Sequence, residues 1–348
     1  MPGLPRASLA AALVAVTGSL LVSCSGGSSA PAASPSPTPS PSVTPSPHPI
    51  AVKTCPLTGV PPRGEQKINR VALAVKIDNV GDARPQAGLD YADLVIEETV
   101  EGGLTRLMAV FQCDKASNVG PIRSARTSDG DLLRLLDGAV FGYSGANPQA
   151  IAPVRATGKA ELIAYDSLPQ YFHRDGSRPA PHNVFSSTAT ILAAGIARNH
   201  KLHAPRTVFS YGKTDHPGRP VKTASMTWPS ASAIWTWNGK AWLRTQSGTA
   251  DVLADGHRVS AANVVVMSIA IASTGLHDVL GNASPDDVVT GHGKVWVLRD
   301  GHVFTGTWNR AKRANRMKLR TSTGKTILLH PGRTWIELLP RPRVPSLS

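Results

Sequence analysis

The chain has 348 residues, of which 41% are hydrophobic and 17% charged, and its formal net charge is +14. These values are ordinary for a globular protein. Beyond the first residues no segment is apolar enough to cross a bilayer, which excludes a protein with several membrane-spanning helices.

The N-terminus has the three parts of a secretory signal peptide. Arg6 supplies the positive charge, and residues 9–21 form an apolar run too short for a stable spanning helix. The run ends in Leu21-Val22-Ser23-Cys24, which resembles a bacterial lipobox. We expect 1–23 to be a lipoprotein signal peptide and Cys24 to receive the lipid. A plain secretory signal with a chance cysteine and a single transmembrane anchor are the alternatives.

Residues 24–51 are expected to form a disordered tether. Positions 25–50 are nearly all Ser, Pro, Ala, Gly and Thr, so they cannot bury apolar area, and their prolines favour an extended polyproline II conformation. The folded part is therefore expected outside the cell membrane, on its extracytoplasmic face, held by the lipid alone.

Residues 52–210 predict a mixed α/β domain, because apolar runs alternate with helical patterns. Buried strands are expected at 71–78, 93–99 and 104–111, with a hairpin turn at Gly102-Gly103 between the last two. Ser124 then resembles the N-cap of a helix, whose apolar face would be Leu132, Leu133, Leu135 and Leu136.

Three further elements complete this domain. A short strand is expected at 139–143, a helix opens at Asn147-Pro148 with proline at its tolerated first position, and another helix covers 188–198.

Residues 222–342 predict a smaller, mainly antiparallel β domain. Asn238-Gly239, Asp255-Gly256 and Asp300-Gly301 tolerate the positive φ angles of tight hairpin turns. A long apolar strand is expected at 264–271, and the segment 211–221, rich in Gly and Pro, is the expected domain boundary. The two parts together predict an α+β fold.

All seven tryptophans lie in this second part: Trp228, Trp235, Trp237, Trp242, Trp296, Trp308 and Trp335. Aromatic faces beside basic side chains can bind glycan, but tryptophans on strands more often fill a core. We therefore expect them to be core residues.

The positive charge is concentrated near the C-terminus. Residues 291–348 contain twelve Lys or Arg and only Asp300 and Glu337 as acids. Export excludes nucleic acid as a natural partner, so the polyanions within reach are anionic lipid and cell-wall polymer. A solvated basic face without a partner is the alternative.

Polar residues of the first part gather in four places: Asp78 and Asn79 followed by Arg84; Glu97, Glu98, Glu101 and Arg106; Arg123, Ser124 and Arg126; and Arg174, Asp175, Arg178, His182 and Asn183. Arg123 and Arg126 flank the expected helix start, where free backbone N–H groups and two guanidinium groups would bind a carboxylate or phosphate. The alternative is that these arginines pair internally with Asp78, Glu97 or Glu101.

Other chemistry is less well supported. Residues four apart on a strand, such as Glu97 and Glu101, are about 13 Å apart, which exceeds the carboxyl separation usual in glycosidases. The sequence has no nucleophile elbow, P-loop, dinucleotide fingerprint or zinc ligand set, so we expect no metal and no cofactor.

Two cysteines remain once Cys24 carries lipid. Exported proteins meet oxidising conditions, so Cys55 and Cys113 could form a disulfide. Two unpaired, buried thiols are the alternative.

The motifs as a series resemble the YerB-like lipoproteins. The series includes Pro56-Leu-Thr-Gly59, Ala83-Arg-Pro-Gln86, Gly120-Pro-Ile-Arg-Ser-Ala-Arg126, Gly306-Thr-Trp308 and Pro331-Gly-Arg-Thr-Trp-Ile-Glu337, and it runs from about residue 55 to 340 in order. The resemblance implies a two-domain envelope lipoprotein and no particular reaction, because the family is known as a domain of unknown function.

The shared polar residues of that family map here onto Asp78, Asn79, Arg84, Glu97, Glu101, Arg106, Arg123, Ser124, Arg126, Arg174, Asp175, Arg178, His182 and Asn183. One departure is Gly142-Tyr143-Ser144, where relatives often carry a histidine before the glycine. A role assigned to that histidine would therefore not transfer to this chain.

These observations favour a non-catalytic envelope protein. It would bind an anionic or wall-derived group at Arg123 and Arg126 and present its basic β domain toward the wall or membrane. The rival is a wall-glycan or peptide hydrolase that uses Asp78, Glu97 or Glu101.

Overall fold

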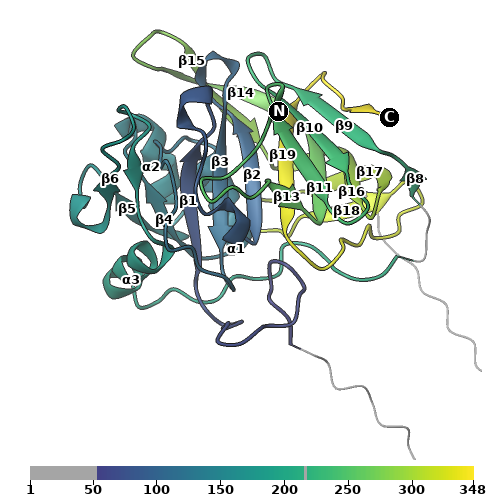
Figure 1. Cartoon of the computed structure of the whole chain (residues 1–348), viewed down its shortest axis with the longest axis horizontal. Coiled ribbons are helices and arrows are strands. Elements are labelled where there is room, and N and C mark those ends of the chain that lie inside the picture. Colours follow the sequence, from purple (N-terminus) through teal and green to yellow (C-terminus); the bar gives the residue numbers. More distant parts are fainter. Residues whose placement is uncertain (1–52, 215–217) are drawn as a thin grey trace, which may run out of the picture. The chain divides into compact units, whose positions relative to one another are not determined.

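The computed structural model describes residues 53–214 and 218–348. The expected signal peptide, the lipid-accepting Cys24 and the tether lie outside these residues. All the described residues belong to one compact unit, Ala51–Ser348. The division into separate domains at 52–210 and 222–342 stays a prediction, and in the structure the strands of both parts join in one sheet (Figure 1).

The first part of the described chain contains all its α-helices, α1 (Asp129–Leu136), α2 (Pro148–Ala156) and α3 (Thr188–Arg198). Its strands are β1 (Ala72–Asp78), β2 (Leu94–Thr99), β3 (Thr105–Phe111), β4 (Ala139–Tyr143), β5 (Ala160–Ala164), β6 (His173–Arg174) and β7 (Val184–Phe185). Four 3₁₀ turns lie between them: η1 (Gly81–Ala83), η2 (Leu89–Tyr91), η3 (Glu101–Gly103) and η4 (Pro169–Tyr171).

The second part is built from strands alone. They are β8 (Arg219–Pro220), β9 (Thr223–Thr227), β10 (Ser232–Trp237), β11 (Trp242–Gln246), β12 (Thr249–Ala250), β13 (Ser260–Ala261), β14 (Asn263–His277), β15 (Ala283–Val288), β16 (Gly291–Arg299), β17 (His302–Arg310), β18 (Lys318–Thr321), β19 (Thr334–Pro340) and β20 (Ser346–Leu347). The α+β class is therefore right in outline: a mixed sheet region with helices is followed by a mainly antiparallel one.

One 12-stranded sheet forms the centre of the molecule. Its main path is β18-β17-β16-β14-β19-β2-β3-β1-β4-β5, with β15 added on β14 and β8 on β17. The late strand β19 lies between β14 and β2 and is parallel to both. Consequently the two parts of the chain share backbone hydrogen bonds across the middle of the sheet.

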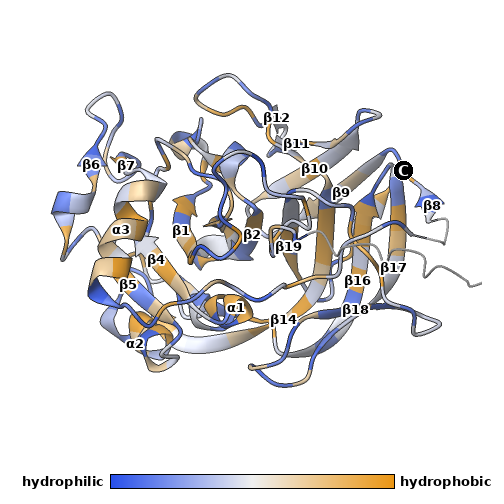
Figure 2. Cartoon of the chain, turned by 90° about the horizontal axis from the view of Figure 1, so that it is seen from below, coloured by the Kyte–Doolittle hydropathy of each residue, from blue (hydrophilic) through white to orange (hydrophobic). Residues whose placement is uncertain are grey.

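The two faces of this sheet carry different cores, because successive side chains of a strand point to opposite sides. Leu73, Val75 and Ile77 of β1 pack into the core that includes the six-stranded sheet β12-β11-β10-β9-β20, to which β13 is joined, and helix α3. Ala72 and Ala74 pack into the core that includes α1. Figure 2 shows the orange of apolar residues on β1 and β14.

Six of the seven tryptophans are buried core residues, as expected, and Trp237 is partly buried against the same core. Trp228, Trp235, Trp242, Trp308 and Trp335 are at most 1% exposed, and their rings fill the space on either side of the large sheet. The Trp235 and Trp335 rings meet edge to face at 5.2 Å, so the small sheet packs directly on the large one.

The hairpin and helix predictions are mostly confirmed. Asn238-Gly239 joins β10 to β11, Asp300-Gly301 joins β16 to β17, and α2 begins after Asn147, whose side chain accepts a hydrogen bond from the Gln149 backbone N–H. The expected strand at 264–271 is longer, since β14 continues to His277 and enters a projecting hairpin with β15.

The predicted helix start at Ser124 is wrong. Helix α1 begins at Asp129, and the segment before it is extended along β1: the Arg123 N–H donates to the Lys76 carbonyl at 2.9 Å, and the Ala125 N–H to the Gly145 carbonyl at 2.9 Å. These donors are therefore not free for an external anion. The carboxylate of Asp129 itself accepts the Arg126 N–H at 2.6 Å.

The structure joins Cys55 and Cys113 in a disulfide across a sequence separation of 58. Both residues are buried, so the bond ties the start of the folded unit to the end of β3. Constraining a loop of this length in the unfolded chain is worth about 4 kcal/mol in the chain-entropy model.

Candidate functional site

A cleft with a volume of about 770 Å³ lies at the end of β1, beside η3 and the extended segment before α1. From the β14–β15 hairpin, the residues that line it are His277, Asp278, Val279, Leu280 and Ser284. Half of the fourteen candidate residues line this cleft: Asp78, Glu101, Arg106, Arg123, Ser124, Arg126 and Arg174.

The first charge group of the cleft is centred on Asp78, which is almost fully buried at the end of β1. Its Oδ2 lies 2.8 Å from the Arg123 Nε and 2.8 Å from the His182 Nδ1. His182 is therefore brought to the cleft edge from a distant loop. The Asp78 carboxylate thus fixes the side chains of Arg123 and His182.

The second charge group joins η3 to the hairpin. Arg126 binds the Glu101 Oε2 through its Nε at 2.8 Å and its Nη2 at 2.6 Å, and the Glu101 Oε1 accepts a hydrogen bond from the Ser284 hydroxyl at 2.5 Å. Burial raises the pKa of Glu101, but the hydrogen bond and charge of Arg126 outweigh it, and the net pKa is lowered. Glu101 is thus an ionised anchor.

Arg106 differs from its neighbours, because it forms no ion pair with any of the described residues. Its Nη1 donates to the Ser124 carbonyl at 3.0 Å, and its side chain is buried in the floor of the cleft. Burial, followed by the charges of Arg126 and Arg123, lowers the pKa of Arg106 to about 9. The guanidinium is still charged at neutral pH, so a buried cation without a carboxylate partner faces the cleft.

A second buried cation lies on the same sheet face below the cleft. The Lys76 ammonium is in contact with Glu98 and lies 2.7 Å from the Asp129 Oδ1, and Ser128 donates to Glu98 at 2.7 Å. Burial lowers the pKa of Lys76 to about 8. Lys76 and Asp129 were not among the candidates from the sequence. A lysine inside the apolar run 71–78 could have indicated a buried charge at this position.

Glu97 and Asn79 are not in the cleft. They lie on the opposite face of the sheet, where Asn79 donates to the Glu97 Oε1 at 2.9 Å and Arg244 binds the Glu97 Oε2 at 2.5 Å. Arg244 also binds Asp251 at 2.5 Å, and all four residues are buried. These four residues form a closed network between the two sheets. Glu97 and Asn79 are therefore part of the scaffold and not of the cleft.

The same network contains a third carboxyl, beside those of Glu97 and Asp251. Glu337 of β19 lies opposite Glu97 in the parallel register and accepts a hydrogen bond from the Trp235 indole at 2.6 Å. Burial, and then the charge of Glu97, raises the pKa of Glu337 well above its ordinary value. Of the two facing carboxyls, Glu337 is therefore the one whose surroundings favour the neutral form.

Most of the other candidates hold loops. Arg178 donates to the carbonyls of Ala83 and Pro85, and Arg84 donates to the Gln246 carbonyl at 3.1 Å. Asp175 pairs with Arg178 at 3.3 Å, and the Asn183 Oδ1 accepts from Arg174 at 2.6 Å. Of this group only Arg174 also lines the cleft, where its guanidinium lies over the Tyr165 ring.

The buried carboxyl of Asp287, at the base of the β14–β15 hairpin, should make the stability of the fold depend on pH. The Asp287 Oδ2 accepts the Thr99 N–H at 2.9 Å, and burial raises the pKa of this carboxyl to about 7. Between about pH 4 and pH 7 the folded state keeps a proton that the unfolded state has lost, so this contribution to stability is complete at low pH and falls as the pH rises. Burial also raises the pKa of Asp93, to about 6, so Asp93 changes the stability in the same direction.

We expect Asp287→Asn to be more stable than the wild type at pH 8 by on the order of 2 kcal/mol, and equal to it near pH 4. Urea unfolding at both pH values measures this difference. An equal difference at the two pH values would show that Asp287 is ionised in the folded protein.

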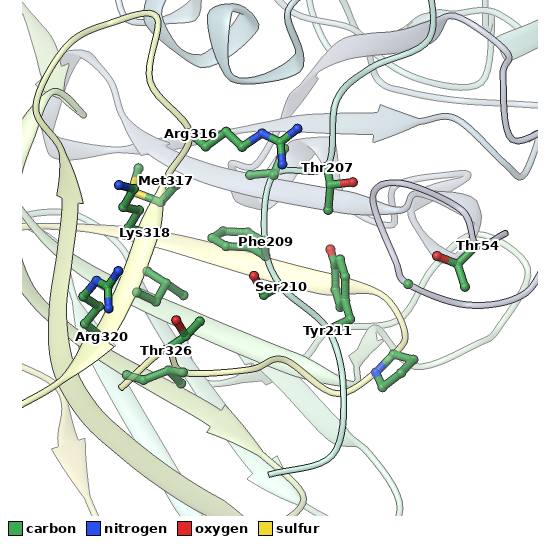
Figure 3. Close-up of a pocket in the computed structure, with 15 residues that line it drawn as sticks. Thr54, Thr207, Phe209, Ser210, Tyr211, Arg316, Met317, Lys318, Arg320 and Thr326 are labelled. Atoms are coloured by element: carbon green, nitrogen blue, oxygen red, sulfur yellow. The ribbon is translucent and has the colours of Figure 1, made fainter. Parts of the chain in front are cut away.

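A second depression, of about 610 Å³, lies at the outer edge of the large sheet. Figure 3 shows Arg316, Lys318 and Arg320 on one side of it and the segment with Phe209 and Tyr211 crossing beside them. Lys318 and Arg320 are exposed neighbours on the same face of β18. Arg299 and Arg313, by contrast, are paired with Asp300 and Asp131, so only part of the basic charge of this segment lines the groove.

Among the described residues, Asp90, Asp255 and His257 are the group whose possible metal-ligand atoms all lie within 4.8 Å of one another. His257 lies 3.2 Å from Asp255 and 3.9 Å from Asp90, so ion pairing accounts for their proximity. No helix of the described residues is long and apolar enough to cross a membrane.

Comparison with known proteins gives a consistent result over most of the chain. Residues 57–201 match the "Protein of unknown function (DUF3048) N-terminal domain", and residues 223–336 match the corresponding C-terminal domain. The chain is 29% identical over 300 residues to "Putative lipoprotein YerB" of Bacillus subtilis (strain 168), covering 84% of this chain and 88% of that protein. A crystal structure of the YerB protein from Bacillus subtilis is similar with a TM-score of 0.72 at 25% identity, covering 84% of this chain and 98% of that one.

Proposed function

This chain belongs to the YerB-like family, whose two domains have no assigned function, and we propose that it is a membrane-anchored envelope lipoprotein that binds an anionic group at Arg106. Its lipid would be carried by Cys24, and residues 24–51 would hold the folded unit off the extracytoplasmic face of the membrane. A bacterial relative named as a lipoprotein supports this placement.

The observation that carries the proposal is that Arg106, buried in the cleft floor, forms no ion pair with any of the described residues, while the charges of Asp78 and Glu101 only partly offset its burial. Asp78 and Glu101, the acids nearest in the cleft, are already bound to Arg123 and Arg126. Removing a cation from water without a partner destabilises the fold, and sites that retain such a cation use it for a ligand. A carboxylate or phosphate in the cleft would accept hydrogen bonds from Arg106, with Arg123 and Arg126 adding long-range attraction.

The geometry supports binding better than hydrolysis. A glycosidase needs a protonated carboxylic acid opposite a second carboxylate. In the cleft the pKa of Glu101 is lowered, and Asp78 is held by Arg123 and His182. Glu97 is closed off on the other sheet face, so of the three acids named for the rival only Asp78 and Glu101 line the cleft, and both are bound to arginines.

The basic groove of Figure 3 supports a role in orientation. Arg316, Lys318 and Arg320 would face wall polymer or anionic lipid while the tether sets the distance from the membrane. Exposed charges of this kind contribute a salt-dependent attraction, so this contact would weaken as ionic strength rises.

The test uses the compact fragment 51–348 and inorganic phosphate or acetate as the probe. We expect a phosphate-dependent rise in the melting temperature of the wild type, since a ligand that binds only the folded state stabilises it. The rise should be absent in Arg106→Gln. It should be retained in Arg198→Gln, which removes an exposed arginine at the C-terminal end of α3. A shift of equal size in Arg106→Gln would overturn the proposal.

A further inference from the structure

Three exposed apolar side chains surround the cationic floor of the cleft. Val279 and Leu280 are 101% and 82% exposed at the tip of the β14–β15 hairpin, and Leu104 is 37% exposed after η3. All three line the cleft that contains Arg106. Large apolar side chains gathered in this way at one site indicate a contact surface.

The hairpin tip is an ordered turn. The Asp278 carboxylate accepts the N–H groups of Leu280 at 2.9 Å and Asn282 at 2.8 Å, and the Asn282 amide donates back to it at 3.0 Å. The tip therefore holds Val279 and Leu280 in a defined position in solvent.

The hairpin base is fixed to the cleft. Ser284 donates to Glu101, the partner of Arg126, and Asp287 accepts the N–H of Thr99 at the end of β2. Figure 1 shows the hairpin projecting beyond the sheet at this end of β14. The apolar tip and the arginine floor are thus held on one framework, with a cavity between them.

We propose that the anionic ligand is an amphiphile: one phosphate or carboxylate attached to an alkyl or acyl chain. This step rests on the proposed function of Arg106. The head group would bind Arg106 in the floor, and the chain would leave the cleft along Leu104 and the hairpin tip. The apolar contact is small compared with the roughly 800 Å² that each partner buries in a stable protein–protein interface, which favours a lipid-like molecule over a protein.

The experiment compares matched probes on fragment 51–348 by isothermal titration. Inorganic phosphate tests the head-group site, dodecyl phosphate below its micelle concentration adds the chain, and dodecyl maltoside supplies the chain without the anion. We expect dodecyl phosphate to bind at least about tenfold more tightly than inorganic phosphate, which corresponds to burial of about two methylene groups. Dodecyl maltoside should bind at least tenfold more weakly than dodecyl phosphate.

The matched variants separate the two parts of the site. Val279→Ser/Leu280→Ser should remove the gain from the chain and leave the affinity for inorganic phosphate unchanged. Ile196→Ser, which changes an exposed apolar residue of α3, should bind both probes as the wild type does. Arg106→Gln should lose both.

Three results would contradict the inference. Equal affinity for inorganic and dodecyl phosphate would overturn the amphiphile while leaving the anion site intact. No binding of either would overturn the anion site as well. Binding to phosphatidylglycerol vesicles without binding of monomeric dodecyl phosphate would show that the hairpin tip inserts into a bilayer instead.

Discussion

Replacing Arg244 by methionine is expected to destabilise the folded chain by about 3 kcal/mol or more. Arg244 is fully buried between the two sheets, binds Glu97 and Asp251, and lies over the Trp335 ring at 4.9 Å from its centroid. Burial lowers the pKa of Arg244, but the charges of Glu97 and Asp251 outweigh it and raise the net pKa. Removing the cation would leave two buried carboxylates without compensation.

Glu337→Gln is the matched control for this prediction. The raised pKa of Glu337 favours its neutral form, and a glutamine could still accept the Trp235 indole hydrogen bond. Urea unfolding at pH 7 should therefore place Glu337→Gln within about 1 kcal/mol of the wild type. If both variants lost the same stability, the network would not be held by the charge of Arg244.

Arg106→Gln is expected to have the opposite effect on stability. In buffer without phosphate or carboxylate the variant should be more stable than the wild type by about 1–2 kcal/mol, because an unpaired buried cation is removed. Thermal unfolding with and without phosphate measures both properties of the site.

The difference in stability between Arg106→Gln and the wild type should depend on ligand. Saturating phosphate would stabilise the wild type and leave the variant unchanged, so the stability advantage of Arg106→Gln should disappear. A variant less stable than the wild type in both buffers would mean that Arg106 is a structural residue, and the cleft would lose its functional argument.

Local signals in the sequence predicted the local structure. Apolar runs and Asn-Gly or Asp-Gly turns gave the strands around Asn238 and Asp300, because a two-residue turn determines its own hairpin. The join of the two parts through β19 was not predictable, because the pairing of Trp335 with Val95 brings together residues far apart in the sequence. Such pairings depend on the packing of the whole sheet.

The site was predicted in part. Arg123, Arg126 and Asp78 were ligand-binding candidates from the sequence, and the structure places them in the cleft, but the helix that was expected to begin at Ser124 begins at Asp129. Both Ser124 and Ser128 precede the apolar helix face, and only the pairing of 122–125 with neighbouring backbone excludes the first of them. Local capping patterns do not contain that information.

The neighbouring residues Glu97 and Glu98 show a signal that was available. Side chains alternate along β2, so one carboxylate must face Arg244 and the other must face Lys76. The alternation of side chains along β2 therefore places Glu97 in the buried network between the two sheets and Glu98 in the group below the cleft. The partners themselves, Arg244 and Lys76, could not be assigned without the strand order.

The most direct test of the anion site is a crystal structure of fragment 51–348 soaked with selenate, a phosphate-sized anion with an anomalous signal. The account predicts an anomalous peak in the cleft within hydrogen-bond distance of the Arg106 guanidinium, and none there in crystals of Arg106→Gln. A cleft without selenate, with Arg106 bound instead to a carboxylate of the protein, would contradict it.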